Sequence, residues 1–400
     1  MQRSLYKMIN FNQNNTYPTT PFLRSGFRVF FMAAGLVAVI SMVLWGVFFH
    51  TTLLTSQIDT VIWHAHEMIF AYAMAVIVGF LLTAVQNWTG IQTLIGKPLL
   101  ALFALWASAR FLPFVADKYL LFQAIIDISF LLFSLIAIAY PIIKTKQWKH
   151  IGVIAKLLFM VIAHSLFYLG LLGFVEQGVT WGLYLGFYLI LSLILMMIRR
   201  LIPFFIERGL GLDYELKNSK FLDVLSLILM VVYIPVEVFF NTPISTVIAT
   251  LLIVIHSIRL IYWYHPKIWT KPLLWGLYLA YGLLILGFGF KVLSYFIILP
   301  PHLDVHSFAF GIGLITISMM SRVSLGHTGN NVFNPPKQLN IIFILLLLSF
   351  IFRIIFPMLS MAYYSEWILV AQVFWISAFT WFLWIYAPMF FKARIDGKFG

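Results

Sequence analysis

The chain is a succession of apolar segments, most of them long enough to cross a lipid bilayer. About 20 apolar residues span the hydrocarbon core as one helix. We expect such helices near residues 26–49, 61–86, 98–115, 119–143, 151–174, 179–198, 221–240, 243–264, 273–290, 303–322, 339–361 and 366–391. A helix pairs its own backbone polar groups, which lipid cannot do for it. The sequence therefore predicts an all-α integral membrane protein with about twelve transmembrane helices in one bundle.

A single polytopic membrane domain is expected to occupy residues 1–400. Residues 1–24 form a polar tail, residues 25–392 the twelve-helix bundle, and residues 393–400 a second tail. No loop is long enough for a soluble domain. The first tail lacks the apolar stretch of a cleaved signal peptide, so we expect it to be a cytoplasmic tail.

The positive charges lie mainly on one side of the predicted bundle. Lys and Arg number 26 against 13 Asp and Glu. Those in the first tail and in the even-numbered loops include Arg24, Arg28, Lys144, Lys146, Lys149, Arg199, Arg200, Arg208, Lys217, Lys220, Lys267 and Lys271. The positive-inside rule then places both termini in the cytoplasm. Because only 10% of residues are charged and 62% are hydrophobic, this charge orients the chain in a lipid bilayer and does not indicate nucleic acid.

Two imidazoles, a carboxylate and a thioether lie within six residues at the start of the second segment, in Trp63-His-Ala-His-Glu-Met68. Ionisable groups at membrane depth usually have a function. On a helix His64 and His66 point about 200° apart, whereas His64 and Glu67 share a face. One His can therefore serve one partner and its neighbour another. The alternative is that these are amphipathic side chains at a helix end, in contact with lipid headgroups.

The tenth segment opens with two more imidazoles, His302 and His306, at the i, i+4 spacing that places both on one helix face. Like His64 and His66, they lie within about 10 Å of the outer boundary, given a rise of about 1.5 Å per residue. If the second and tenth helices are neighbours, these residues form one outer site. For His302 alone, which follows two prolines, a position among the headgroups is the alternative.

A second set of candidates lies toward the cytoplasm. His327 is about 30 Å along the helix from His306, near Arg199, Arg200 and Arg322. Such cations suit carboxylates, for example haem propionates. The alternative is that they are snorkelling anchors at helix ends. His164 and His256 lie inside apolar segments and are interpreted as hydrogen-bonded packing residues.

Several kinds of chemistry are excluded by the sequence. The chain has no cysteine, so it has no disulfide, thiolate copper site or iron–sulfur cluster. It contains no glycine-rich phosphate loop and no Gly-x-Ser-x-Gly elbow. A cysteine-free, histidine-rich site within the membrane suits copper bound by imidazole and thioether, or haem iron on an axial His.

Six blocks of sequence resemble the NnrS family, from near the start of the chain to its last third. They are Pro21–Arg24, Trp63–Met68, Gly79–Gly90, Ile202–Phe205, Pro272–Trp275 and Ser324–Gly329. The resemblance implies a bacterial inner-membrane protein with twelve helices that contains haem and copper and takes part in the response to nitric oxide. By position it singles out His64, His66, Glu67, His306 and His327.

The leading hypothesis is a haem–copper protein that binds or detoxifies nitric oxide, either by holding it at ferrous iron or copper or by reducing it, with Glu67 as a candidate proton carrier to the site. The haem is expected to be of the b type, since the chain has no Cys-x-x-Cys-His. His64, His66 and His306 are expected to form the outer site, and His327 to act separately. The alternatives are a nitric oxide sensor or metal-homeostasis protein without turnover, and a transporter. The sequence identifies no electron donor.

Overall fold

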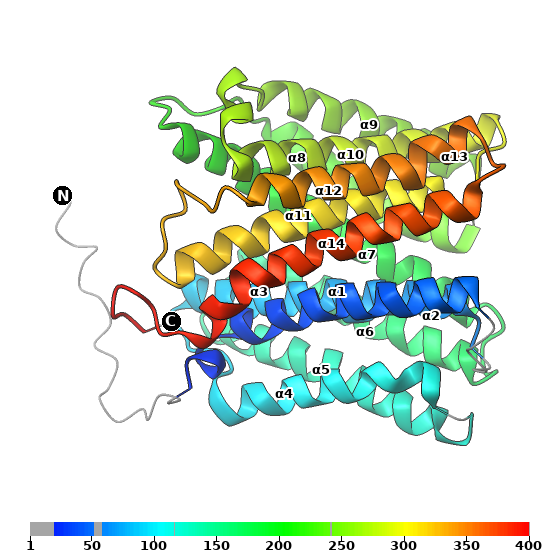
Figure 1. The fold of residues 1–400 in the computed structure, drawn as a ribbon, viewed down its shortest axis with the longest axis horizontal. Coiled ribbons are helices and arrows are strands. Elements are labelled where there is room, and N and C mark those ends of the chain that lie inside the picture. Colours follow the sequence, from blue (N-terminus) through cyan, green and yellow to red (C-terminus); the bar gives the residue numbers. More distant parts are fainter. Residues whose placement is uncertain (1–19, 52–57, 116, 241, 400) are drawn as a thin grey trace.

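The structure, a computed structural model, describes residues 20–51, 58–115, 117–240 and 242–399, and all regular structure in these ranges is helical (Figure 1). Labels α and η denote α-helices and 3₁₀ or π helices. The elements are η1 (Pro21–Arg24), α1 (Gly26–His50), α2 (Thr60–His66), η2 (Glu67–Ala73), α3 (Met74–Thr89), α4 (Gly96–Ser108), η3 (Ala109–Phe114), η4 (Asp117–Tyr119), α5 (Leu120–Lys144), η5 (Trp148–His150), α6 (Ile151–Leu171), α7 (Gly178–Leu210), α8 (Lys220–Pro235), η6 (Val236–Phe240), α9 (Pro243–Tyr262), η7 (Pro266–Thr270), α10 (Pro272–Phe296), α11 (Leu303–His327), α12 (Leu339–Phe350), η8 (Ile351–Ile355), α13 (Phe356–Leu359) and α14 (Tyr364–Phe391).

Eleven helices of the described chain are long and apolar enough to cross a membrane. The chain is therefore a multi-pass membrane protein. The segment expected at 98–115 differs, because its α-helix, α4, has only 13 residues. The 3₁₀ helix η3 continues it, and at about 1.5 and 2.0 Å per residue the two together extend about 30 Å. This composite runs along the bundle beside α5 (Figure 1).

The sixth predicted helix is longer in the structure than its pattern indicated. Expected at 179–198, it continues as α7 to Leu210. Pro203 lies inside this helix, and Gly211, with φ of 64°, ends it in the left-handed conformation that favours glycine. Arg199 and Arg200 consequently lie within a helix and not at its end.

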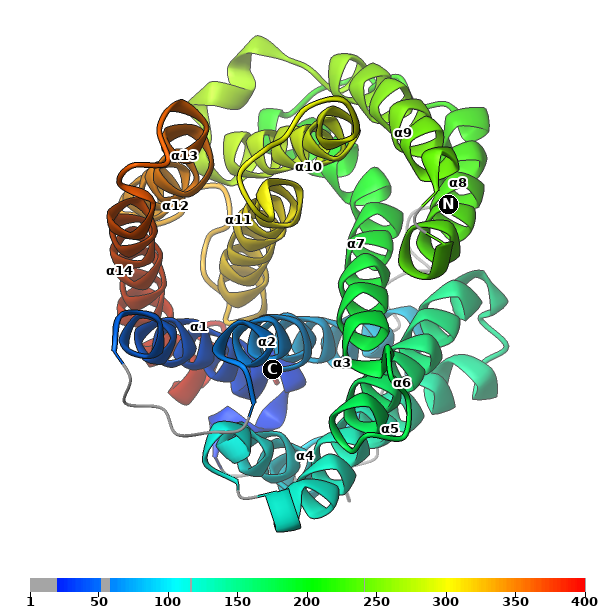
Figure 2. The same cartoon turned by 90° about the vertical axis from the view of Figure 1, so that its right-hand side faces the viewer.

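The start of the first long helix and the end of the last one lie side by side at one end of the bundle. The Arg28 guanidinium, near the start of α1, donates to the carbonyls of Met389, Phe390 and Lys392 at the end of α14. We call this end of the bundle the termini end and the opposite one the far end. Figure 2 looks onto the far end and shows α3 and α11 near the centre, with α4, α9 and α14 at the periphery.

In the described part of the chain, three spans contain a π-helical segment near the far end, and each segment buries one acidic or basic side chain. These residues are Glu67 in η2, Glu237 in η6 and Arg353 in η8. A π segment leaves a backbone carbonyl without its usual helical partner, and such segments are frequent at functional sites. In η2 the Trp106 indole N–H donates to the Ala71 carbonyl at 3.2 Å. The extra residue is thus stabilised by a neighbouring helix.

Glycines let α6 and α7 pack closely. A Cβ atom added at Gly182 would lie 2.5 Å from the backbone nitrogen of Phe167 and 2.7 Å from the carbonyl oxygen of Ala163. Backbone cannot move aside as a side chain can, so only glycine fits there. Small residues at helix contacts are a general means of association in membranes. The contact fixes the position of His164, which lies between these two α6 residues.

Candidate metal centre

His66 and Glu67 lie where α2 passes into η2, and both are buried. Two further buried ionisable residues lie at the same depth on neighbouring spans, Asp127 on α5 and His164 on α6. Each is about two turns from the far end of its helix. Because α5 packs against α6, these side chains converge within the bundle.

Three donor atoms form a nearly equilateral triangle. His66 Nε2 lies 3.0 Å from His164 Nε2 and 3.3 Å from Asp127 Oδ2, and His164 Nε2 lies 3.4 Å from the same oxygen. Ligands about 2.1 Å from one metal ion are ~3.0 Å apart at right angles and ~3.4 Å apart in a tetrahedron. The triangle therefore has the dimensions of three ligands on one face of a metal ion.

A second layer of hydrogen bonds holds His66 and Asp127, whereas the Nδ1 atom of His164 is buried without a hydrogen-bond partner among the described residues. Glu67 Oε1 lies 3.0 Å from His66 Nδ1. The Arg110 guanidinium, from η3, donates to Glu67 Oε2 at 2.9 Å and to Asp127 Oδ1 at 2.7 Å. The Tyr168 hydroxyl donates to Asp127 Oδ2 at 2.9 Å. A carboxylate on the second nitrogen of an imidazole is the usual support for a metal-binding His.

The charges of this cluster do not balance without a further cation. The carboxylates of Glu67 and Asp127 face the single guanidinium of Arg110, so one negative charge is left over. An uncompensated buried charge is costly. A metal ion within the triangle, or a proton on His66, would neutralise it. The donor atoms, their spacing and the charge all fit a bound cation.

Aromatic rings cover the imidazoles of the triangle. The Phe70 ring stacks on His164 with centroids 4.0 Å apart and an angle of 8° between the planes. The Phe167 ring stacks on His66 at 4.7 Å. These rings exclude water from one side of the cluster and keep the imidazole planes in place.

The structure separates His64 from His66, which we expected to share the outer site with His306. His64 stacks on Trp45 of α1, with ring centroids 4.7 Å apart. It lies near His306 and Arg353, close enough for electrostatic interaction. His64 and His66 lie apart because side chains at positions i and i+2 of a helix point in nearly opposite directions.

Arg353 makes the environment of His64 and His306 basic. Its guanidinium lies 3.3 and 3.4 Å from the two ring nitrogens of His306. None of the ion pairs among the described residues includes Arg353. A cation bound by these imidazoles would be repelled, so this pair fits a metal ion less well than the triangle does.

The side chain of His302 does not lie in one site with that of His306. It is exposed and adopts a positive φ of 58° just before α11 begins. Its carbonyl oxygen, not its ring, contacts His306 Nδ1, at 2.8 Å. The expectation of a headgroup-level residue fits this position.

The residues that we expected to form a site toward the cytoplasm, His327 and three arginines, do not lie together either. The His327 ring lies 5.5 Å from that of Phe27, and its carbonyl accepts from Arg394 at 3.0 Å. A hydrogen bond from Arg394 holds the pKa of the exposed Asp396 carboxyl below its usual value. His327 is thus at the termini end, packed against α1 and the C-terminal segment.

The three expected arginine partners of His327 make other contacts. Arg199 pairs with Asp223 of α8 at 2.6 Å. Arg322 lies over the ring of Phe205 on α7, 4.0 Å from its centroid. Arg200 is exposed. These contacts leave no common arrangement of the three guanidinium groups around His327.

Four residues of the cluster were not identified from the sequence as site residues: Arg110, Asp127, His164 and Tyr168. His164 was interpreted as a packing residue because no acid lies near it in sequence. A signal was nevertheless present, since Asp127 is an acid inside an apolar helix. The three residues Asp127, His164 and His66 lie at similar distances from the helix ends on the same side of the bundle, and comparing these distances would have predicted that they meet.

Comparison with known proteins gives one match. The family model described as NnrS protein matches residues 21–394. No curated protein matches the chain.

Proposed function

We propose, from the premise that this chain belongs to the NnrS family, that it binds nitric oxide at a metal ion held by His66, Asp127 and His164. The observation that carries this proposal is the triangle of donor atoms 3.0–3.4 Å apart. The family resemblance supports the choice of nitric oxide, and the buried negative charge supports the choice of a cation.

Two metals suit this donor set. Imidazole binds copper well, and copper is what the family resemblance implies. Two His and one carboxylate on one face, with open positions opposite, are also the typical ligands of non-haem ferrous iron. Either metal supplies an open coordination position at which nitric oxide binds. Direct metal analysis distinguishes the two.

The residues around the triangle have separate tasks in this proposal. Glu67 accepts the Nδ1–H of His66, which directs the Nε2 lone pair toward the metal position. Tyr168 and Arg110 fix the carboxylate of Asp127. If nitric oxide is reduced, the reaction needs protons, and Glu67 is our candidate carrier because it connects Arg110 with His66.

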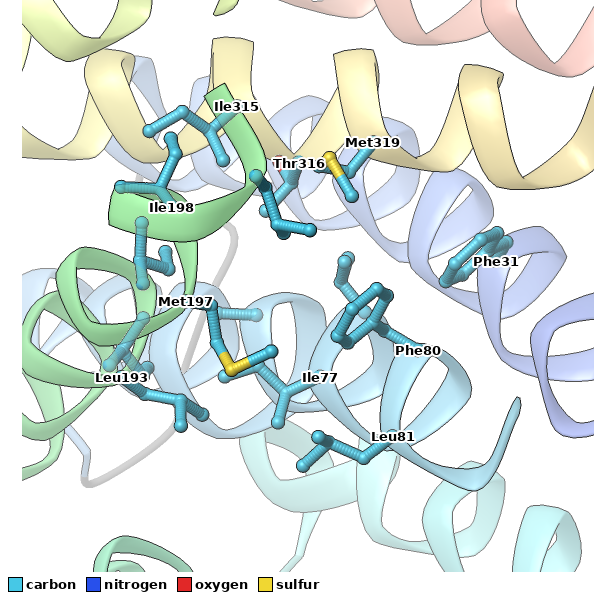
Figure 3. Close-up of a pocket in the computed structure, with 15 residues that line it drawn as sticks. Phe31, Ile77, Phe80, Leu81, Leu193, Met197, Ile198, Ile315, Thr316 and Met319 are labelled. Carbon is cyan, nitrogen blue, oxygen red and sulfur yellow. The ribbon is translucent and has the colours of Figure 1, made fainter. Parts of the chain in front are cut away.

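Haem b is implied by the resemblance, but two of its candidate ligands, His64 and His327, have aromatic rings packed where a porphyrin would lie. The rings of His64 and His327 pack on Trp45 and Phe27. The central cavity of about 70 Å³ has no imidazole in its lining (Figure 3). An axial haem ligand must face a slot for the porphyrin. The proposed nitric oxide binding therefore does not involve haem, and an optical spectrum of the purified protein tests whether haem is bound.

The proposed setting is the inner membrane of a bacterium, with both termini in the cytoplasm. The triangle then lies near the outer face, where nitric oxide arrives from outside the cell or from the bilayer.

The test is metal and nitric oxide binding by purified protein and matched variants. We expect one copper or iron per chain, a spectral change on adding nitric oxide, and loss of both in Asp127→Asn and His164→Gln. Glu67→Gln should weaken metal binding by about 10–100-fold. The control is His256→Gln, which alters a buried His bonded to Tyr281 outside the cluster. Wild-type metal content in both Asp127→Asn and His164→Gln would exclude the proposal.

The same preparation distinguishes binding from turnover. If the reduced protein removes one equivalent of nitric oxide and then consumes no more, it is a sensor or a metal-homeostasis protein. Steady consumption with a reductant indicates a reductase.

A further inference from the structure

An apolar cavity of about 70 Å³ lies inside the bundle among α1, α3, α7 and α11 (Figure 3). Its lining side chains include Phe31, Ala73, Ile77, Ile190, Leu193 and Ile315. No charged residue lines it, and its hydroxyl group, that of Thr316, already bonds to Tyr72 and the Gly313 carbonyl. Cavities of this kind stay dry and accept small apolar guests such as xenon.

The cavity follows from the path of two helices. α7 packs on η2, where Gly186 makes room for Phe70: a Cβ atom at Gly186 would lie 2.8 Å from the Phe70 ring. Beyond this contact α7 packs much less against α3. Side chains from both helices then line an open space instead of filling it.

The cavity begins about one turn from the proposed metal centre. Ala73 and Ile77 lie three and seven residues after Phe70, and Ile190 and Leu193 lie four and seven after Gly186, so on both helices the lining begins within about one turn of the Phe70–Gly186 contact. Phe70 itself stacks on His164 of the triangle. Phe70 therefore connects the metal ligands with the two helix segments that go on to line the cavity.

Three residues on the other side of the cavity are partly exposed: Phe80 of α3 and Ile194 and Met197 of α7. A small apolar molecule dissolved in the bilayer can reach the cavity between these side chains. An ion or a water molecule finds no polar group there.

We propose that this cavity is a binding site for a small apolar gas, and that it leads from the bilayer past Phe70 to the metal centre. The gas-binding part stands on the cavity alone. The second part rests on the proposed function, because it assigns nitric oxide as the guest and the metal as its destination.

Xenon tests the cavity without any metal. We expect a saturable ¹²⁹Xe NMR signal from the purified protein that is lost in Ala73→Leu, which fills the space. Ile190→Phe fills it from the opposite helix, in case one variant does not fold. The control is Ala84→Leu, on α3 but outside the lining. Absence of a saturable site in wild-type protein, or wild-type xenon binding in both filled variants, overturns the proposal.

Nitric oxide kinetics test the route. In metal-loaded protein, Ala73→Leu should slow nitric oxide association several-fold and leave metal content unchanged, whereas Ala84→Leu should match wild type. Equal association rates in all three proteins exclude the route. If wild-type protein binds xenon but no metal, the proposed function fails and the gas site stands.

Discussion

At the scale of single residues, Arg110 determines the charge balance of the metal centre. Its guanidinium contacts both Glu67 and Asp127. Removing one partner of a buried ion pair typically costs about 3–5 kcal/mol. We expect Arg110→Gln to lower the free energy of unfolding by about this amount, measured by thermal unfolding in detergent.

A bound metal ion should partly replace the missing charge. Adding the metal that the wild type binds should therefore raise the unfolding temperature of Arg110→Gln by more than that of the wild type. An equal rise in the two proteins would show that the cation and the guanidinium do not act on the same carboxylates.

His327 provides the contrasting prediction. It lies at the termini end, against Phe27, and α11 separates it from His306 by about 30 Å. His327→Ala should leave the copper or iron content of the triangle at the wild-type level, as measured by elemental analysis. A variant that inserts normally but loses this metal would contradict the separation of the two sites.

At the scale of secondary structure, η2 determines which way His66 points. Deleting Ala71 should restore an ordinary α-helix and turn His66 by about 100° relative to α3. We expect unchanged helicity by circular dichroism but no metal binding. Trp106→Phe removes the N–H that supports the π segment and keeps an aromatic ring there, and this control should retain the metal. Metal binding in the Ala71 deletion would show that the π segment is dispensable.

The contact between α6 and α7 gives a second prediction at this scale. Gly182→Val should destabilise the protein by about 1–3 kcal/mol or more, because its side chain meets the backbone on both sides of His164. It should also weaken metal binding. Gly289→Ala, on α10, has no atom within 4 Å of the added Cβ and should keep wild-type stability and metal content.

Apolar length and the positions of helix-breaking residues were enough to locate the helices, but not their irregularities. The π segments arise from one extra residue in a run of mostly apolar residues without a distinct polar face, so periodicity cannot reveal them. The 13-residue α4 was expected as a full span because its 3₁₀ continuation has the same apolar composition. The direction in which His66 points depends on such details.

For the whole molecule, the need to pair backbone polar groups in lipid makes the helical spans predictable from the sequence. Which helices contact one another depends on side-chain packing and is not predictable in the same way. Helix geometry indicated that His64 and His66 point in different directions, but both were expected in one outer site with His306, and the structure places them apart. The proximity of His66 to His164 was not expected, because it depends on α2, α5 and α6 meeting at one depth. Nothing in the local sequence of His164 indicates Asp127 as its partner.

The orientation in the membrane is a prediction that the absence of cysteine makes simple to test. Glu176, between α6 and α7 at the far end, and Lys217, between α7 and α8, are both exposed. A membrane-impermeant maleimide should label Glu176→Cys in intact cells and Lys217→Cys only after permeabilisation. The reverse pattern would place the termini outside.

The proposed metal centre draws all its polar residues, from His66 to Tyr168, from the first half of the chain. The ribosome therefore completes these residues while more than half of the protein remains to be made. At ~5–20 residues per second, that remainder takes about ten seconds or more. A metal site made of these residues would be open to loading during this interval. α7, made next, then packs its Gly186 against Phe70, so synthesis order favours loading before the site is enclosed.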